Sequence, residues 1–256
     1  GIVLLVFSVL IKMGDYMDNL IRYSTIEEKN KREILLLIGS GCKWKKCSFC
    51  DYHTDFNKNP DFCFKINEKE LNKVTGKYNT LEIVNSGSFV DLDKKTMKKI
   101  EDICVSKNIN KLHFECHWAH KDEIEHLKNY FKNIGIDVKT KIGIETFDYY
   151  YRESFLNKGI EERDVNVIKQ YFNEVCLLQG LAGQSIEFML KDIAIGLEHF
   201  ERVCINIMVK NKTRIKPDPN TIENFKKYIY PIYKNNNRVD ILLENTDFGV
   251  GGNKND

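Results

Sequence analysis

The chain has 256 residues, of which 39 are Lys or Arg and 37 are Asp or Glu, so its formal net charge at pH 7 is +2. This length suits one large α/β domain, and so balanced a charge gives no general attraction to nucleic acid. We therefore expect a small-molecule partner and no direct nucleic-acid partner. Residues 2–11 form an apolar run, but a bilayer takes about 20 residues to span, so no membrane association is predicted.

From residue 33 onward, short runs rich in Ile, Leu and Val alternate with longer amphipathic stretches. The predicted strands cover residues 34–38, 81–85, 111–117, 138–145, 174–179, 203–209 and 239–244. The predicted helices cover residues 68–77, 94–107, 121–134, 164–172, 184–200 and 222–235. Strands alternating with helices indicate βαβ units and a parallel sheet. This α/β pattern predicts a partial (β/α)6 barrel of the TIM type.

The chain divides into three parts. Residues 1–32 form an N-terminal lead-in segment, in which residues 13–32 are expected to be helical. Residues 33–245 contain the barrel, because no low-complexity linker or internal repeat interrupts them. Residues 246–256 form a polar, glycine-rich C-terminal tail. In barrels of this type the reactive residues lie at the C-terminal ends of the strands.

A cysteine loop follows the first predicted barrel strand. Cys42, Cys47 and Cys50 are spaced as Cys-x4-Cys-x2-Cys. Iron–sulfur clusters are normally held by four cysteines, so three thiolates leave one iron free to bind another molecule. Two alternatives remain open: a zinc site completed by His53, or three unrelated thiols. The other five cysteines are dispersed, which favours a reducing compartment, the cytoplasm, over a disulfide framework.

The cysteine loop resembles that of the radical S-adenosylmethionine (SAM) superfamily. Phe49 stands where that family keeps an aromatic residue near the adenine of SAM. The commonest family spacing has three residues between the first two cysteines, whereas residues 43–46 make four here. The resemblance implies that Cys42, Cys47 and Cys50 hold a 4Fe-4S cluster, with the amino and carboxylate groups of SAM on its open iron.

Two further strand ends resemble motifs of the same family. Ser86, Gly87 and Ser88 follow the second strand and resemble a glycine-rich turn that meets the amino group of SAM; an ordinary βα turn is the alternative. Residues 143–146 read GIET, similar to a GIE(S/T) motif whose carboxylate contacts SAM. The resemblance thus makes Glu145 a cofactor-binding candidate, and a structural salt bridge is the alternative.

The end of the fifth strand carries a third motif. Residues 179–184 read QGLAGQ, which resembles the GLPGQT turn of coproporphyrinogen-dehydrogenase-like radical SAM enzymes, with Ala182 in place of proline. In those enzymes the backbone of the turn meets the adenine edge. The resemblance implies that Gly180 and Leu181 bind the cofactor.

Substrate candidates lie at the end of the third strand and in the tail. Strand alternation places Glu115 and His117 on one face, where both are candidates for substrate binding and catalysis, while Trp118 could stack on the substrate. The alternative is that a histidine caps the following helix. Asp247 and Phe248 are expected to reach the substrate from the tail, unless the tail is simply a terminus.

Taken together, these motifs resemble the queuine lyases. The resemblance implies a lyase that uses a 5′-deoxyadenosyl radical to cleave a carbon–nitrogen bond of queuine, releasing 7-aminomethyl-7-deazaguanine for tRNA queuosine salvage. A deazaguanine base needs a carboxylate for its donors and an aromatic ring for stacking. Alternatives are another small-molecule radical SAM enzyme, similar to coproporphyrinogen dehydrogenase, or a non-catalytic iron–sulfur or zinc protein.

Three lysines lie within the cysteine loop itself: Lys43, Lys45 and Lys46. We expect them to form a solvated basic rim. This rim could attract an acidic one-electron donor such as flavodoxin through charge that salt screens. The alternative is that the lysines are only solvated.

Overall fold

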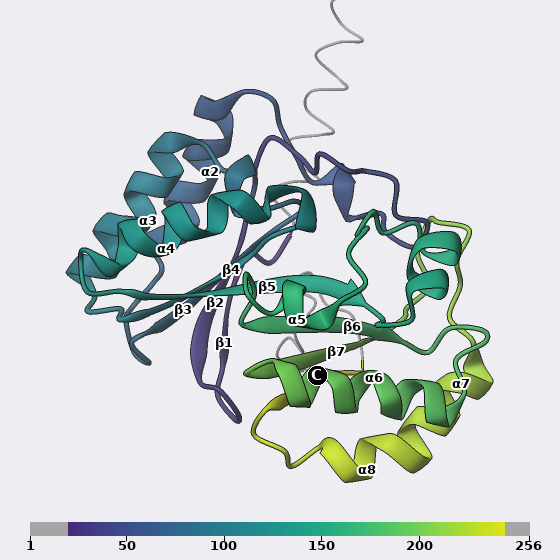
Figure 1. The fold of residues 1–256 in the computed structure, drawn as a ribbon. Helices are drawn as coiled ribbons and strands as arrows, with labels where there is room; N and C mark the ends of the chain where they lie inside the picture. The colour runs from purple at the N-terminus through teal and green to yellow at the C-terminus, as the bar shows by residue number, and fades with distance from the viewer. Residues whose placement is uncertain (1–19, 244–256) are drawn as a thin grey trace, which may run out of the picture.

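The computed structural model describes residues 20–243 and is built on one curled, eight-stranded sheet (Figure 1). Its strands follow the chain order: β1 (Tyr23–Ile26), β2 (Arg32–Leu37), β3 (Thr80–Asn85), β4 (Lys111–Glu115), β5 (Asp137–Glu145), β6 (Glu174–Gln179), β7 (Arg202–Ile207) and β8 (Val239–Leu242). β1 is antiparallel to β2, and every later pair is parallel. The predicted partial TIM-type barrel is therefore confirmed.

Helices connect the parallel strands across the outer face of the sheet. They are α2 (Pro60–Leu71), α3 (Lys94–Ser106), α4 (Ile124–Lys132), α5 (Val165–Ile168), α6 (Ile186–His199), α7 (Pro219–Asn224) and α8 (Tyr230–Tyr233). Short 3-10 segments are η1 (Tyr52–Thr54), η2 (Phe89–Asp91) and η3 (Trp118–Glu123), and π-helical segments are η4 (Tyr151–Phe155) and η5 (Phe225–Ile229). In Figure 1, α2, α3 and α4 cover one half of the sheet and α6, α7 and α8 the other. Among the described residues no helix is long and apolar enough to cross a bilayer.

Two sequence predictions are corrected. β1 replaces the predicted helix over the described part of residues 13–32, because Asn30 takes a left-handed φ of 49° and turns the chain back onto β2. α2 begins at Pro60 rather than Glu68, since the Asn59 side chain accepts hydrogen bonds from two backbone amides of its first turn. Residues 1–19 and 244–256 lie outside the described part of the chain.

Strand alternation separates an apolar outer face from a charged interior. Leu35, Ile83, Phe114 and Leu177 are fully buried and pack in the main hydrophobic core with the helices. Alternate residues point to the inside of the barrel, where charged residues from several strands form one buried layer. The core therefore stabilises the barrel from outside, while the interior holds the charged layer and a small apolar cluster around Ile34 and Val84.

Glu82 is the centre of this buried charged layer. Its carboxylate forms ion pairs with Arg32 of β2 and Lys141 of β5, and Arg202 of β7 lies 3.6 Å from it. Burial alone would raise the pKa of Glu82, but the three cations hold it well below its usual range. One carboxylate thus joins strands that are distant along the chain.

Glu174 of β6 extends the layer around the barrel. It lies 2.7 Å from the Arg202 guanidinium and 3.1 Å from Nδ1 of His113, and Arg202 also lies 3.2 Å from Asp240 of β8. Although burial alone would raise the pKa of Glu174, His113 and Arg202 lower it to about 2. Within the described residues, the end of the barrel away from the cysteine loop is therefore filled by paired charges.

Candidate active site

The cysteine loop lies across the C-terminal edge of the sheet, where it meets the ends of several strands. Gly87, in the turn after β3, approaches it so closely that a Cβ there would lie 3.3 Å from Cα of Cys42. That Cβ would also lie 2.3 Å from Asp91, whose carboxylate accepts the backbone N–H of Ser88. Ser86 donates its hydroxyl to the backbone of Asp55 at the end of the loop. The predicted turn after β3 is thus in contact with the cysteine loop.

The segment after β5 holds the other side of the loop. Trp44 donates from Nε1 to the carbonyl of Asn157 at 2.8 Å, and Asn157 donates from Nδ2 to the carbonyl of Lys46 at 2.9 Å. Gly159, with φ of 73°, lies under the Trp44 ring, where a Cβ would be 2.4 Å from the indole. Only glycine takes both this backbone angle and this contact without strain. The loop is therefore locked onto residues 156–159.

Lys158 is the central cation of the site and is not among the predicted site residues. Its ammonium lies 2.7 Å from Oε1 of Glu145 and 5.5 Å from the centre of the Phe49 ring. Burial alone would lower the pKa of Lys158, but Glu145 and Cys47 raise it. No sequence signal marks this lysine, because its position depends on how the segment after β5 folds back.

Glu145 takes an unusual backbone conformation at the end of β5. Its φ is 65°, and the pairing of β5 with β6 is irregular between Gly143 and Glu145. A Cβ at Gly143 would lie 2.7 Å from Oε1 of Glu145 and 3.0 Å from the Lys158 ammonium. A non-glycine residue at positive φ beside a bulge is a feature that clusters at functional sites. Glu145 forms the salt bridge that was the alternative to a cofactor-binding role. The same ion pair holds its carboxylate close to the cysteine loop.

The three loop cysteines are free, half-buried thiols. Burial raises the pKa of Cys47 to about 12 and also raises that of Cys50, and the nearby Lys158 ammonium opposes both rises. Within residues 20–243, no three His, Cys, Asp or Glu side chains converge as a single metal ion requires. A zinc site completed by His53 is therefore not formed in the described residues.

The turn after β6 meets the loop through side chains. Leu181 is fully buried in a small apolar cluster against which Phe49 packs. The Leu181 amide donates to Oε1 of Gln184 at 3.0 Å, and the Gly180 carbonyl accepts from the Asp218 amide at 2.9 Å. These two backbone groups already have protein partners, and the buried Leu181 side chain supports Phe49 from behind the cysteine loop.

Glu115 lies inside the barrel, one layer above the charged network. Lys141 reaches it at 3.2 Å while also pairing with Glu82, and a third of the Glu115 side chain stays accessible. Burial raises the pKa of Glu115, and Lys141 opposes this rise. A carboxylate with one fixed partner and open acceptor sites can receive a hydrogen bond from a ligand.

His117 faces the cysteine loop, but both of its ring nitrogens are used by the fold. Nε2 lies 2.9 Å from the Lys158 carbonyl, Nδ1 accepts from the Ala119 amide at 3.2 Å, and the ring stacks on Trp44. Burial and the Lys158 ammonium lower the pKa of His117 to about 4. The neutral imidazole, hydrogen-bonded at both nitrogens, caps η3 and supports the loop as the capping alternative expected. Its catalytic and substrate-binding role stays a prediction.

Trp118 points away from the barrel interior. Its ring packs edge-on against Tyr171 and beside Phe172, against the main hydrophobic core. Trp118 begins η3 after β4 has ended and is held by these aromatic partners, and its stacking on a substrate stays a prediction. Asp247 and Phe248, the other substrate candidates, lie outside the described residues.

Comparison with solved structures decides the family. The chain is 42% identical to a "queuine lyase from Clostridium spiroforme bound to SAM and queuine", with a TM-score of 0.86, and the match covers 91% of this chain and all of that one. The chain belongs to the queuine lyase family. The resemblance to the radical SAM superfamily is confirmed by this match. No family model matches the chain, and neither does any curated protein.

The residues present fit the 4Fe-4S cluster of radical SAM enzymes. Cys42, Cys47 and Cys50 are unpaired thiols on one loop, and thiolates are the ligands of such clusters. The backbone also approaches the loop closely at Gly87, which has no side chain to obstruct a ligand. In this queuine lyase family member, the three cysteines would hold the cluster with one iron left open.

Proposed function

We propose that the protein cleaves the carbon–nitrogen bond of queuine between the cyclopentenediol and the aminomethyl group, releasing 7-aminomethyl-7-deazaguanine. The observation that carries the proposal is the similarity, at 42% identity over the full solved chain, to a queuine lyase bound to SAM and queuine. The barrel also supports it: charge pairs fill one end, so a substrate inside the barrel would lie next to the cysteine loop at the other end.

The cofactor side of the site is formed by the loop and three strand ends. Cys42, Cys47 and Cys50 would hold the cluster, which when bound supplies one electron for cleaving SAM and so forming the 5′-deoxyadenosyl radical. The remaining candidates for SAM are Phe49, Ser86, Gly87, Ser88, Glu145, Gly180 and Leu181. Of these, Glu145 is fixed by Lys158 at 2.7 Å, so its carboxylate is held ready to accept a hydrogen bond from the cofactor.

Glu115 carries the substrate side. Its carboxylate is accessible from the barrel interior and anchored by Lys141 at 3.2 Å. It would accept hydrogen bonds from the ring N–H and amine donors of the deazaguanine, or from the secondary ammonium next to the bond that breaks. The surrounding barrel would exclude water from the carbon radical. Asp247 and Phe248 remain candidates for completing this site from the tail.

The proposal includes a reducing setting and an electron source. All eight cysteines are free, as suits the cytoplasm. An external one-electron donor such as flavodoxin is required because the reduced state of the cluster is the reactive one.

Product analysis tests the proposal directly. The protein, reconstituted with iron and sulfide under anaerobic conditions, is incubated with SAM, a chemical reductant and either queuine or coproporphyrinogen III. We expect 7-aminomethyl-7-deazaguanine from queuine and no conversion of the porphyrinogen. Conversion of coproporphyrinogen III with queuine left intact would favour the alternative enzyme. Absence of 5′-deoxyadenosine under all conditions would favour a non-catalytic protein.

A further inference from the structure

A second loop packs against the cysteine loop at the edge of the barrel. Asn211, between β7 and α7, donates from Nδ2 to the Phe49 carbonyl at 2.6 Å. The Lys212 amide donates to Asp51 at 3.2 Å, and the Arg214 guanidinium donates to the Ser48 hydroxyl at 3.3 Å. Residues 42–58 and 210–216 therefore form one continuous surface, which we call the two-loop surface. In Figure 1 these segments meet at the right of the view.

The two-loop surface concentrates positive charge that no carboxylate of the described residues pairs. Its eight exposed cations are Lys43, Lys45, Lys46, Lys58, Lys210, Lys212, Arg214 and Lys216, and its two acids are Asp51 and Asp55. Asp55 is already bound by Arg22 at 2.7 Å. The whole chain has a net charge of only +2, so the charge of this surface is local and is balanced elsewhere on the molecule.

Aromatic rings position several of these lysines without neutralising them. The Lys45 and Lys58 ammonium groups lie 4.5 Å and 5.7 Å from the centre of the same Phe56 ring. Lys46 lies 5.0 Å from the Trp44 ring. Cation–π contacts fix the position of a charge but leave it as a full cation. The surface is therefore preorganised to receive anionic groups.

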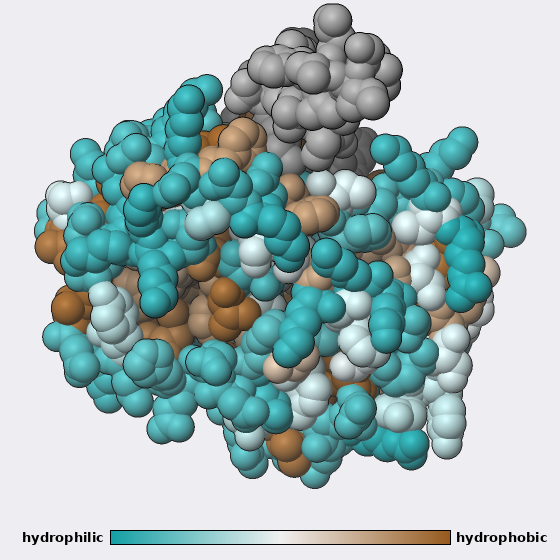
Figure 2. All heavy atoms as spheres, turned by 90° about the horizontal axis from the view of Figure 1, so that it is seen from above, coloured by the Kyte–Doolittle hydropathy of each residue, from teal (hydrophilic) through white to brown (hydrophobic). Residues whose placement is uncertain are grey.

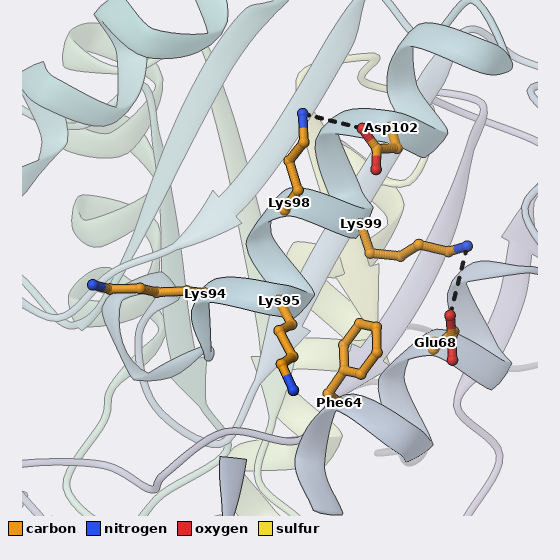
Figure 3. A pocket seen from close by; sticks show the side chains of 7 residues that line it. All are labelled: Phe64, Glu68, Lys94, Lys95, Lys98, Lys99 and Asp102. Carbon is orange, nitrogen blue, oxygen red and sulfur yellow. Dashed lines mark ion pairs between the residues drawn. The ribbon is translucent and has the colours of Figure 1, made fainter. Parts of the chain in front are cut away.

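A second basic cluster, on α3, provides the contrast. Figure 3 shows Lys94, Lys95, Lys98 and Lys99 beside Phe64, with dashed ion pairs from Lys98 to Asp102 and from Lys99 to Glu68. Lys95 also pairs with Asp61 at 2.6 Å. Three of these four lysines thus have acidic partners, so this hollow is nearly neutral and does not compete with the two-loop surface for anionic partners.

We propose that the two-loop surface is the docking site for an acidic one-electron carrier protein, with residues 210–216 supplying half of its charge. The inference rests on the proposed function, since the cysteines that would hold the cluster belong to the same loop as Lys43, Lys45 and Lys46. An electron must enter where the cluster is nearest to solvent, and complementary charge accelerates such encounters. The right half of the face in Figure 2 is mostly hydrophilic, as suits a small, weak and salt-sensitive redox contact.

Cluster reduction by a bacterial flavodoxin in its hydroquinone state tests the proposal. The variant Lys210→Glu/Lys212→Glu reverses two charges whose side chains take no part in the hydrogen bonds between the loops. Stopped-flow absorbance at low salt should show cluster reduction about tenfold slower or more than in the parent, and the difference should shrink as salt rises. The control Lys94→Glu/Lys95→Glu makes the same charge change on α3 and should leave the rate within about twofold of the parent.

Titanium(III) citrate, a small reductant, separates this inference from the proposed function. With it, all three proteins should reduce their clusters and form 5′-deoxyadenosine at equal rates. If the parent and both variants respond equally to flavodoxin at low salt, the docking surface is refuted while the proposed function stands. If the parent forms no 5′-deoxyadenosine even with titanium(III) citrate, the proposed function fails and the docking inference falls with it.

Discussion

The ammonium of Lys158 lies 2.7 Å from the carboxylate of Glu145, and the two side chains, 12% and 8% exposed, lie beside the cysteine loop. This ion pair joins the strained end of β5 to the segment that holds Trp44. It fixes the carboxylate of Glu145, a residue whose backbone takes a positive φ of 65°. The pair thus couples the fold of residues 156–159 to the geometry of the cofactor site.

A double-mutant cycle on this pair measures its contribution to stability. Lys158→Met leaves the Glu145 carboxylate buried and unpaired, so the free energy of unfolding should fall by about 3 to 5 kcal/mol. Lys158→Met/Glu145→Gln removes both charges and should recover part of that loss. Urea unfolding of the cluster-free protein gives these energies. Glu145→Gln alone completes the cycle, and a loss in the double variant equal to the sum of the two single losses would mean that the two residues are not coupled.

Gly143→Ala tests whether this ion pair positions the cofactor carboxylate. The new Cβ would lie 2.7 Å from Glu145 and 3.0 Å from Lys158, so the pair must move. We expect SAM affinity, measured by calorimetry on the reconstituted protein, to fall about tenfold or more, since a charged hydrogen bond contributes about 1.5 to 3 kcal/mol. Gly135→Ala, outside the site, is the control: its Cβ meets nothing within 4 Å, and although its φ of 80° strains the local backbone, it should keep the parent affinity for SAM. A Gly143→Ala protein with unchanged affinity would place SAM away from Glu145.

Glu115→Gln should weaken queuine binding and leave SAM binding nearly unchanged. The substitution preserves size but turns one acceptor into a donor, at a cost of about 1.5 to 3 kcal/mol to a charged hydrogen bond. Because burial raises the pKa of Glu115, acidifying the solution should protonate it, and so weaken queuine binding, at a higher pH than for an ordinary glutamate. In Glu115→Gln this loss of affinity in acid should disappear. Calorimetry at several pH values measures both effects; loss of SAM affinity with queuine affinity intact would move Glu115 to the cofactor site.

The buried charged layer predicts loss of stability in acid. The pKa of Glu174 falls from 4.5 to about 2 on folding. A carboxyl group with a lowered pKa stabilises the fold above its unfolded pKa, and this contribution is lost as the pH falls from about 4.5 toward 2. Glu174→Gln should lower the free energy of unfolding at pH 7 and flatten its slope over that range.

Glu201→Gln is the matched control for Glu174→Gln. Glu201 pairs with Lys139 at the surface at 3.0 Å, and such exposed pairs contribute about 0 to 1 kcal/mol. Urea unfolding at pH 3, 5 and 7 compares the two variants. If Glu174→Gln and the parent show the same slope of stability with pH, the buried layer is not what makes the fold acid-sensitive.

The sequence predicted the order of strands well because their apolar outer faces are a local signal. β6 was predicted at its observed bounds, Glu174–Gln179. β1 was missed because Tyr23–Ile26 is short, polar and lies at the sheet edge, where pairing with β2 decides its conformation. The start of α2 was missed although Asn59 and Pro60 are ordinary signals of a helix N-terminus.

The candidate site was predictable only in its backbone motifs. The cysteine spacing and the glycines at residues 87, 143 and 180 stand in continuous sequence. Lys158 and Asn211 reach the loop from other strand ends, so only the folded chain reveals them. The packing of Trp118 could not be predicted, because its aromatic partners Tyr171 and Phe172 are distant in sequence.

The most direct test of the account is formation of 7-aminomethyl-7-deazaguanine from queuine by the anaerobically reconstituted protein, its Cys47→Ala variant and its Cys104→Ala variant. Cys104 is a buried thiol in α3, away from the cysteine loop, so its loss should leave product formation near the parent level. Cys47→Ala removes one cluster ligand and should abolish both 7-aminomethyl-7-deazaguanine and 5′-deoxyadenosine while the fold is retained. A Cys47→Ala protein that forms the deazaguanine at the parent rate would contradict the account.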